Sequence, residues 1–218
     1  VVSALFRQIS GEAKRQALAF ELERSELERR ALDARMRLLQ AQVEPHFLFN
    51  TLANVRELVE TASPQAPRVL DQLIAYLRAA VPRLQETTTR VSDELDLVRA
   101  YLALMQMRIP DRLQYAVDAE PEVLGLSCPA TALLTLVENA VRHGIDPAED
   151  GGRIDVRVSA FGGRCRAQVI DTGVGLAATA RPGGTGLSNL RERLALVFGP
   201  EAGVRELPLV PRGTRAEI

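Results

Sequence analysis

Tryptophan is absent from this 218-residue chain, and aromatic residues make up only 4% of it. Base-stacking platforms and aromatic ligand cages are therefore not expected, because both are built from several aromatic rings. The formal net charge is -1, so the composition does not provide the strongly basic surface of a nucleic-acid-binding protein. With 46% hydrophobic and 25% charged residues, the composition is that of an ordinary soluble protein of one or two domains.

Cysteines and long apolar runs are also scarce. Cys128 and Cys165 are the only cysteines, and neither lies in a CxxC pair or beside a histidine, which favours reduced thiols over a disulfide framework. The sequence contains no run of about 18 apolar residues, so it predicts no membrane span. Because the first residue is Val1 rather than methionine, we expect a fragment in which residues 1–9 end an upstream membrane or sensor segment.

The first half of the sequence has the periodicity of helices. Residues 12–43 contain no glycine or proline and are rich in helix-forming residues, which predicts one long helix with two apolar seams suited to a bundle. Helical spacing also predicts helices over 47–61 and 68–81, joined by a turn. A further helix is expected from an N-cap at Ser92 to about Ile109, so this part reads as a helical hairpin and stem.

After Pro110 the pattern becomes that of a sheet with helices. Residues 113–117, 154–159 and 165–169 alternate apolar and polar side chains, and Gly162-Gly163 separates the last two as a hairpin turn. Helices are expected over 130–143 and 187–198. The sequence therefore predicts an α+β fold, in which a helical-hairpin stem precedes an α/β sandwich with a mixed, largely antiparallel sheet.

The first motif with chemical meaning is Pro45-His46-Phe47-Leu48-Phe49-Asn50. A proline inside a helical segment removes a backbone donor and bends the helix, here next to His46. Imidazole is a good nucleophile toward phosphorus at neutral pH, and Asn50 shares the helical face of His46 four residues on. Taken alone, the motif fits an ordinary histidine of an amphipathic helix at least as well.

The second motif is Leu136-Val137-Glu138-Asn139-Ala140-Val141-Arg142-His143-Gly144. On a helix, Asn139 and His143 share one face, with Arg142 beside them. An amide oxygen, a guanidinium and an imidazole on one face suit a polyphosphate bound with Mg²⁺. Ordinary solvated polar residues explain the same spacing equally well.

Two glycine-containing motifs follow. In Asp171-Thr172-Gly173-Val174-Gly175 a carboxylate at a strand end can accept a hydrogen bond from a purine amine, although turns after strands often have this pattern. Gly183-Gly184-Thr185-Gly186-Leu187 leads into a helix, which places free amides and the positive end of the helix dipole at an anion site. This loop is not a Walker loop, because the single lysine of the chain is Lys14.

The order of these four motifs resembles that of bacterial sensor histidine kinases of two-component systems. The segments QVEPHFLFNTL and LVENAVRHG resemble the LytS-type subfamily, and the resemblance covers roughly residues 35–218. It implies a linker or signalling helix (1–43), dimerisation and histidine phosphotransfer helices (44–109), and a catalytic ATP-binding domain (110–218). The last domain would have the Bergerat fold of the GHKL proteins.

The resemblance also implies a role for each motif residue. His46 would be the phosphoacceptor, assisted by Asn50, with Glu44 as the nearest candidate for the base because Phe47 stands where many histidine kinases have an acidic residue. Asn139 would bind Mg²⁺, Arg142 and His143 would lie toward the phosphates of ATP, and Asp171 would read the adenine amine. Gly173 and Gly175 would form the floor of the pocket. A mobile lid over ATP would span 177–185, and the second glycine-rich motif at its end would contribute Gly184, Thr185, Gly186 and Leu187.

The activity that follows is ATP-dependent autophosphorylation of His46 in a homodimer, with transfer to an aspartate of a response-regulator receiver. We expect no nucleic-acid partner and contact with the membrane only through an upstream segment, as in the cytoplasmic domain of an inner-membrane-anchored sensor. One alternative is a degenerate GHKL module that binds ATP and signals by dimer rearrangement without phosphotransfer. Another is a GHKL ATPase or serine kinase, although Thr135 replaces the glutamate of the hydrolytic relatives, which favours phosphotransfer over hydrolysis.

Overall fold

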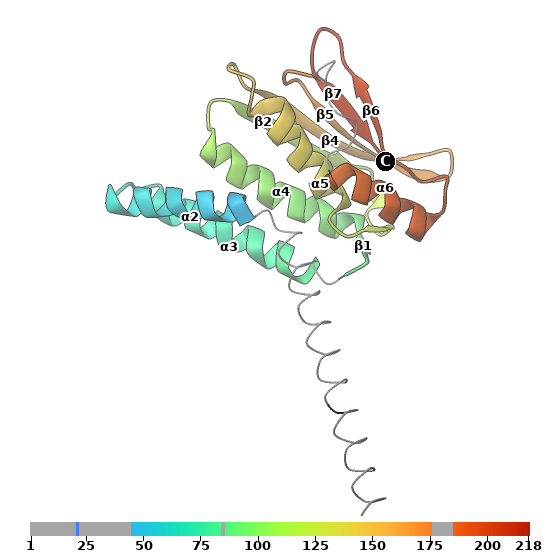
Figure 1. The fold of residues 1–218 in the computed structure, drawn as a ribbon, viewed down its shortest axis with the longest axis horizontal. Helices are drawn as coiled ribbons and strands as arrows, with labels where there is room; N and C mark the ends of the chain where they lie inside the picture. The colour runs from blue at the N-terminus through green and yellow to red at the C-terminus, as the bar shows by residue number, and fades with distance from the viewer. Residues whose placement is uncertain (1–20, 22–44, 84–85, 176–184) are drawn as a thin grey trace, which may run out of the picture. The chain divides into compact units, whose positions relative to one another are not determined.

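The computed structural model describes residue 21 and residues 45–83, 86–175 and 185–218, without the side chains of 45–50 and 185. By its internal contacts the chain divides into two compact units, Val1–Leu48 and Phe49–Ile218. Almost all described residues belong to the second unit (Figure 1). The expected signalling helix over 12–43 lies outside the described residues.

Two helices come first among the continuous described residues, and the second unit begins within the first of them, at Phe49. Helix α2, Pro45–Glu60, contains the predicted histidine motif in its first turns, and helix α3, Ala66–Arg83, follows after a short turn. In that turn the amide of Ser63 donates to the carbonyl of Leu58 at 2.8 Å, which satisfies an acceptor at the end of α2. These two helices confirm the helical segments predicted on either side of 61–67. Pro45 stands at the first described position of α2, and the predicted bend beside it stays a prediction.

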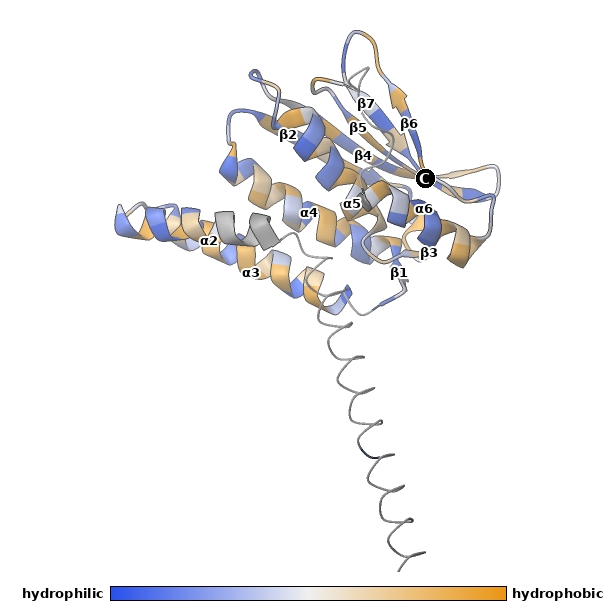
Figure 2. Cartoon of the chain, viewed as in Figure 1, coloured by the Kyte–Doolittle hydropathy of each residue, from blue (hydrophilic) through white to orange (hydrophobic). Residues whose placement is uncertain are grey.

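Helix α3 has one buried face. Val69, Leu73, Tyr76 and Ala80 recur at helical spacing and are all at most 2% exposed. This face packs against helix α4, Val91–Arg108, where the rings of Tyr76 and Tyr101 lie with their centroids 6.0 Å apart. Figure 2 shows that apolar residues recur along the whole length of both helices.

Helix α4 lies between α3 and the rest of the unit, so it is buried on more than one side. It contacts α3, helix α5 (Ala132–Asn139) and strand β2 (Leu113–Ala119). Its N-cap differs from the prediction, because the cap position is Arg90 rather than Ser92 and no side chain caps the helix. The amides of Val91 and Ser92 instead donate to the carbonyls of Leu126 and Leu124, at 2.9 and 3.0 Å.

A five-stranded mixed sheet forms the other layer, with the strand order β2-β4-β5-β7-β6. Strand β2 pairs in parallel with β4, and all other neighbours pair antiparallel, which confirms the predicted fold class. Besides β2, the strands of this sheet are β4 (Gly152–Phe161), β5 (Arg164–Asp171), β6 (Arg205–Pro208) and β7 (Thr214–Glu217). A second, two-stranded sheet pairs β1, Thr88–Arg90, with β3, Ser127–Pro129.

The sheet buries one face, as the alternation in the sequence predicts. Ile154, Val156 and Val158 of β4 are at most 2% exposed, and Val156 lies opposite Val169 of β5. Helices α4, α5 and α6 (Thr185–Phe198) lie on one side of this sheet (Figure 1). The turn Gly162-Gly163 joins β4 to β5, and both glycines have positive φ.

Three local features depart from the prediction or were not foreseen. The helix predicted over 130–143 is α5 followed by a π-helix, Ala140–Ile145, so the regular helix ends at Asn139. Strands β6 and β7 and the small sheet were not predicted. A short 3₁₀ turn, Pro121–Val123, also connects β2 to β3.

Among the residues that the structure places, no helix is both long enough and apolar enough to cross a membrane.

Candidate functional site

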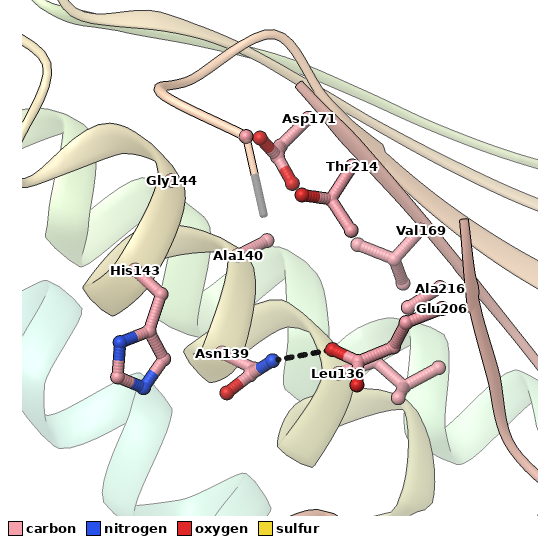
Figure 3. Close-up of a pocket in the computed structure, with 11 residues that line it drawn as sticks. Leu136, Asn139, Ala140, His143, Gly144, Val169, Asp171, Glu206, Thr214 and Ala216 are labelled. Atoms are coloured by element: carbon pink, nitrogen blue, oxygen red, sulfur yellow. Dashed lines mark hydrogen bonds between the residues drawn. The ribbon is translucent and has the colours of Figure 1, made fainter. Parts of the chain in front are cut away.

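A pocket opens between α5 with its π-helix and the strands β5, β6 and β7 (Figure 3). Its lining combines apolar side chains with a few polar groups, as ligand sites usually do. It encloses about 40 Å³, so only part of a nucleotide-sized ligand would lie inside it. The lining residues are Leu136, Asn139, Ala140, His143, Gly144, Val169, Asp171, Gly175, Glu206, Thr214 and Ala216.

Asp171, at the end of β5, is the buried carboxylate of this pocket and is only 3% exposed. The amide of Gly173 donates to its Oδ1 at 2.9 Å, and Thr214 of β7 donates to it from both its amide and its hydroxyl. Burial raises the pKa of Asp171, and these hydrogen bonds oppose the rise. The result is an oriented acceptor, suited to a ligand that brings its own hydrogen-bond donor.

Backbone segments pack tightly around Asp171, and glycines make this possible. A Cβ atom on Gly173 would lie 2.1 Å from the carbonyl oxygen of Gly144, and one on Gly213 would lie 2.2 Å from the carbonyl oxygen of Asp171. Gly213 also has a φ of 112°, which L side chains rarely adopt. The amide of Val174 donates to the carbonyl of Gly144 at 3.0 Å, so the turn after β5 is attached to the π-helix.

The π-helix begins where the regular helix ends, directly after Asn139. The amide of Asp146 donates to the carbonyl of Val141 at 2.8 Å, which is the five-residue spacing of a π-turn. Such turns frequently occur at functional sites. Here the turn contains Arg142, His143 and Gly144, and it contacts both β4 and β5.

The N-terminal end of α5 is held by a buried carboxylate from α4. Glu94 is completely buried, and its two oxygens accept the amides of Thr131 at 2.6 Å and Leu133 at 3.1 Å. Arg193 of α6 donates to the carbonyl of Ala130 and to the hydroxyl of Thr131, so three helices meet here. Burial raises the pKa of Glu94 to about 7, although the hydrogen bonds and Arg193 act to lower it. These contacts fix the helix that carries Asn139.

Asn139 lies at the C-terminal end of α5 and meets an acidic partner across the pocket. Its Nδ2 donates to Oε1 of Glu206, on strand β6, at 3.3 Å (Figure 3). Oε2 of Glu206 lies 3.9 Å from a guanidinium nitrogen of Arg191 on α6. In the described part of the chain no group of three or more His, Cys, Asp and Glu residues could hold a metal ion. A divalent cation at Asn139 would therefore need further oxygen ligands from its own ligand or from water.

The structure brings together several of the residues that the sequence singled out. Asn139, His143, Asp171 and Gly175 all line the pocket, and Gly173 packs behind it. Arg142 is exposed and is not among the lining residues, and neither are Gly186 and Leu187 at the start of α6.

The remaining predicted site residues lie outside the described residues or have no described side chain. Glu44 and Gly184 lie outside the described residues, as does most of the expected lid at 177–185. For His46, Asn50 and Thr185 the structure describes the helical backbone and not the side chain. Their roles stay predictions.

Sequence reasoning missed Gly144 as a packing residue and missed Glu206, Gly213 and Thr214 altogether. The pair Gly213-Thr214 was a weak signal, since a glycine before a short strand often marks a close backbone approach. Glu206 has no local signal, because only the pairing of β6 with β7 brings it to the pocket.

Two family models match the chain and cover most of it between them. The model described as "Histidine kinase" matches residues 34–113. The model described as "Histidine kinase-, DNA gyrase B-, and HSP90-like ATPase" matches residues 129–218, which include every residue lining the pocket. Residues 129–218 are therefore similar to the ATPase domains that this model describes.

Individual relatives agree with the family models. The sensor protein LytS of Enterococcus faecalis is 34% identical over 83% of this chain and 33% of its own length. The LytS protein of Bacillus anthracis is 32% identical over 94% of this chain and 37% of its own length. The chain thus spans about a third of the length of these curated relatives.

Among solved structures, the histidine kinase domain of the blue-light activated histidine kinase of Erythrobacter litoralis matches with a TM-score of 0.47 and 16% identity. That match covers 86% of this chain and 93% of the other. From the two family models and the LytS relatives, the chain belongs to the histidine kinases and is of the LytS type.

Proposed function

We propose that this chain is the kinase region of a sensor histidine kinase, which uses ATP bound at the Asn139–Asp171 pocket to phosphorylate His46. The observation that carries the proposal is the buried, oriented carboxylate of Asp171 at one end of a pocket that has Asn139 at the other. An exocyclic amine could donate a further hydrogen bond to the carboxylate of Asp171, which the amide of Gly173 already orients. The polar Asn139 and His143 would then lie toward the phosphates.

Magnesium fits this arrangement through Asn139. The carbonyl oxygen of an asparagine side chain is a hard ligand of the kind that Mg²⁺ prefers, and Mg²⁺ usually completes its shell with water and substrate phosphates. When bound, the ion would supply positive charge that neutralises the polyphosphate. Asp171 would hold the adenine base, and the glycines around it let the backbone segments that position its carboxylate pack closely on one another.

In the proposed transfer the unprotonated ring nitrogen of His46 attacks the γ-phosphorus of ATP. A nitrogen–phosphorus bond forms, the bond from the γ-phosphorus to the bridging oxygen breaks, and ADP leaves. The proton on the other ring nitrogen goes to a base, for which Glu44 is the nearest candidate in sequence. Asn50, one helical turn from His46 in α2, would orient the phosphoryl group. The phosphoryl group would then pass to an aspartate of a response-regulator receiver.

A second copy of the chain is the partner that we propose for the helical part. On α3, Leu70, Ile74 and Val81 recur at helical spacing and are 42%, 39% and 52% exposed, on a stripe beside the face that packs on α4. An apolar stripe of this kind is what a helix presents to a bundle. Leu52 and Val59 of α2 are also exposed, which fits a pair of helices contributed by each protomer.

Incubation of the chain with radiolabelled ATP and Mg²⁺ tests the proposed activity. We expect a label on the protein that is labile in acid and stable in base, and we expect His46→Gln to abolish it while nucleotide binding persists. Label that survives in His46→Gln would overturn the role of His46. Nucleotide binding without any phosphoprotein would select the alternative in which ATP only rearranges the dimer.

A further inference from the structure

Glu206 has no role in the function proposed above, although it lines the pocket beside the proposed magnesium ligand. It lies on β6 opposite Ala216 of β7, and its side chain is only 19% exposed. Figure 3 shows its carboxylate facing the amide nitrogen of Asn139, which donates to it at 3.3 Å. The charge is unexpected here, because a carboxylate beside a polyphosphate site repels the ligand.

The chemistry of the two groups fixes how Asn139 is turned. A carboxylate has only acceptors, whereas a side-chain amide has donors on its nitrogen and acceptors on its oxygen. The amide of Asn139 must therefore turn its NH₂ group toward Glu206, which directs its carbonyl oxygen away from β6. In Figure 3 this oxygen points away from Glu206. The oxygen is the end that can bind a cation, since the NH₂ group offers no lone pair for a metal.

Arg191 in turn holds Glu206 in place. One guanidinium nitrogen lies 3.9 Å from Oε2 of Glu206, and Nε donates to the carbonyl of Val204 at 3.5 Å. The guanidinium of Arg191 thus connects α6 with the segment around β6. A carboxylate with one oxygen near a cation and the other accepting from an amide has little freedom to turn.

We propose that Glu206 is a positioning residue that holds the amide of Asn139 with its carbonyl oxygen available to magnesium. This inference rests on the proposed function, in which Asn139 binds the magnesium of an ATP complex. Groups that orient a metal ligand in this way commonly change metal affinity about 10-fold to 100-fold when they are removed. Replacement by glutamine lets Asn139 turn either end toward residue 206, since glutamine can both donate and accept.

The role of Glu206 predicts that its replacement weakens nucleotide binding only when magnesium is present. Binding of AMP-PNP to the 218-residue chain is measured by titration calorimetry in EDTA and in saturating Mg²⁺. In Glu206→Gln we expect affinity in EDTA to be equal or a few times tighter, because a negative charge near the phosphates is gone. The gain in affinity from Mg²⁺ should fall about tenfold. A misfolded pocket would weaken binding in both conditions.

The matched control is Glu217→Gln. Glu217 lies on the neighbouring strand β7, and it also accepts a side-chain amide, from Gln168 at 3.0 Å, yet it does not line the pocket. We expect Glu217→Gln to leave both affinities unchanged. An equal loss of the magnesium gain in this control would overturn the proposed role of Glu206.

A double-mutant cycle with Asn139→Ala separates positioning from direct metal binding. If Glu206 acts through Asn139, adding Glu206→Gln to Asn139→Ala leaves the magnesium gain unchanged. A further loss in the double variant would make Glu206 an independent ligand and overturn the proposal. If magnesium does not change the affinity of the wild-type chain for AMP-PNP, the proposed function itself is overturned. If magnesium increases the affinity of Glu206→Gln as much as that of the wild type, only this inference is overturned.

Discussion

Gly144 lies so close to Asp171 that a Cβ atom on it would be 2.6 Å from Oδ1 of that carboxylate. The absence of a side chain at position 144 therefore lets the buried carboxylate keep its position at the end of β5. The contact joins the π-helix to the strand on the opposite side of the pocket.

Gly144→Ala should therefore weaken nucleotide binding by displacing Asp171. We expect affinity for AMP-PNP to fall and stability to drop by about 1–3 kcal/mol, because the added methyl group meets a packed neighbour. Calorimetric titration and urea unfolding measure the two effects. Gly203→Ala is the control, since a Cβ there would meet no heavy atom within 4 Å. Unchanged binding in Gly144→Ala would contradict the tight contact.

If Asp171 reads an exocyclic amine, the chain should prefer adenosine to inosine nucleotides. Inosine has a carbonyl oxygen where adenosine has the amine, and this oxygen would face a carboxylate without a hydrogen between them. A site built to pair with one group rejects its counterpart by large factors, on the order of 100-fold or more. Competition binding with ATP and ITP measures the preference. Asp171→Asn should reduce it, and equal affinity of the wild type for the two nucleotides would contradict the assigned role.

Glu94 should make folding stability depend on pH. Its pKa in the folded chain is raised to about 7 from 4.5, chiefly by burial, so folding favours the protonated carboxyl. The associated stability is fully present below pH 4.5 and is lost as the pH rises toward 7. The loss relative to Glu94→Gln approaches about 3 kcal/mol. Urea unfolding of both proteins from pH 4.5 to 8 measures it, and parallel curves would contradict the raised pKa.

A charge on the exposed face of α3 should prevent self-association. Ile74 lies in the middle of that apolar stripe, and Ile74→Glu places a carboxylate where we propose that a second copy packs. Light scattering should give a dimer for the wild type and a monomer for the variant. Leu196→Glu serves as the control, because Leu196 of α6 is 85% exposed and lies outside the stripe. Dissociation by both variants, or by neither, would contradict the proposed interface.

Much of the fold could be predicted because its signals are local. The alternation of Ile154, Val156 and Val158 identifies β4 and its buried face, and the two glycines after Phe161 mark the hairpin. Helices α2 and α3 follow from apolar spacing that ends at a proline-containing turn. The order of the motifs predicted that Asn139 and Asp171 belong to one site, and both line the pocket.

The features that escaped prediction depend on distant contacts. Strands β6 and β7 have four residues each, too short to show an alternation, and they form because β7 pairs with β5. Ser92 has the side chain of an N-cap, yet the carbonyls of Leu124 and Leu126 take over that function. Glu206 reaches Asn139 from 67 positions away, so neither spacing nor composition could connect them.

The π-helix after Asn139 constrains the length of this segment as well as its composition. A turn closed over five residues holds one more residue than a regular turn, which changes the direction that every later residue faces. Deleting a single residue within 140–143 would let the regular helix continue and would rotate Gly144 away from the β5 carboxylate. We therefore expect insertions and deletions in this stretch to disrupt the fold more than single substitutions at its exposed positions, Arg142 and His143.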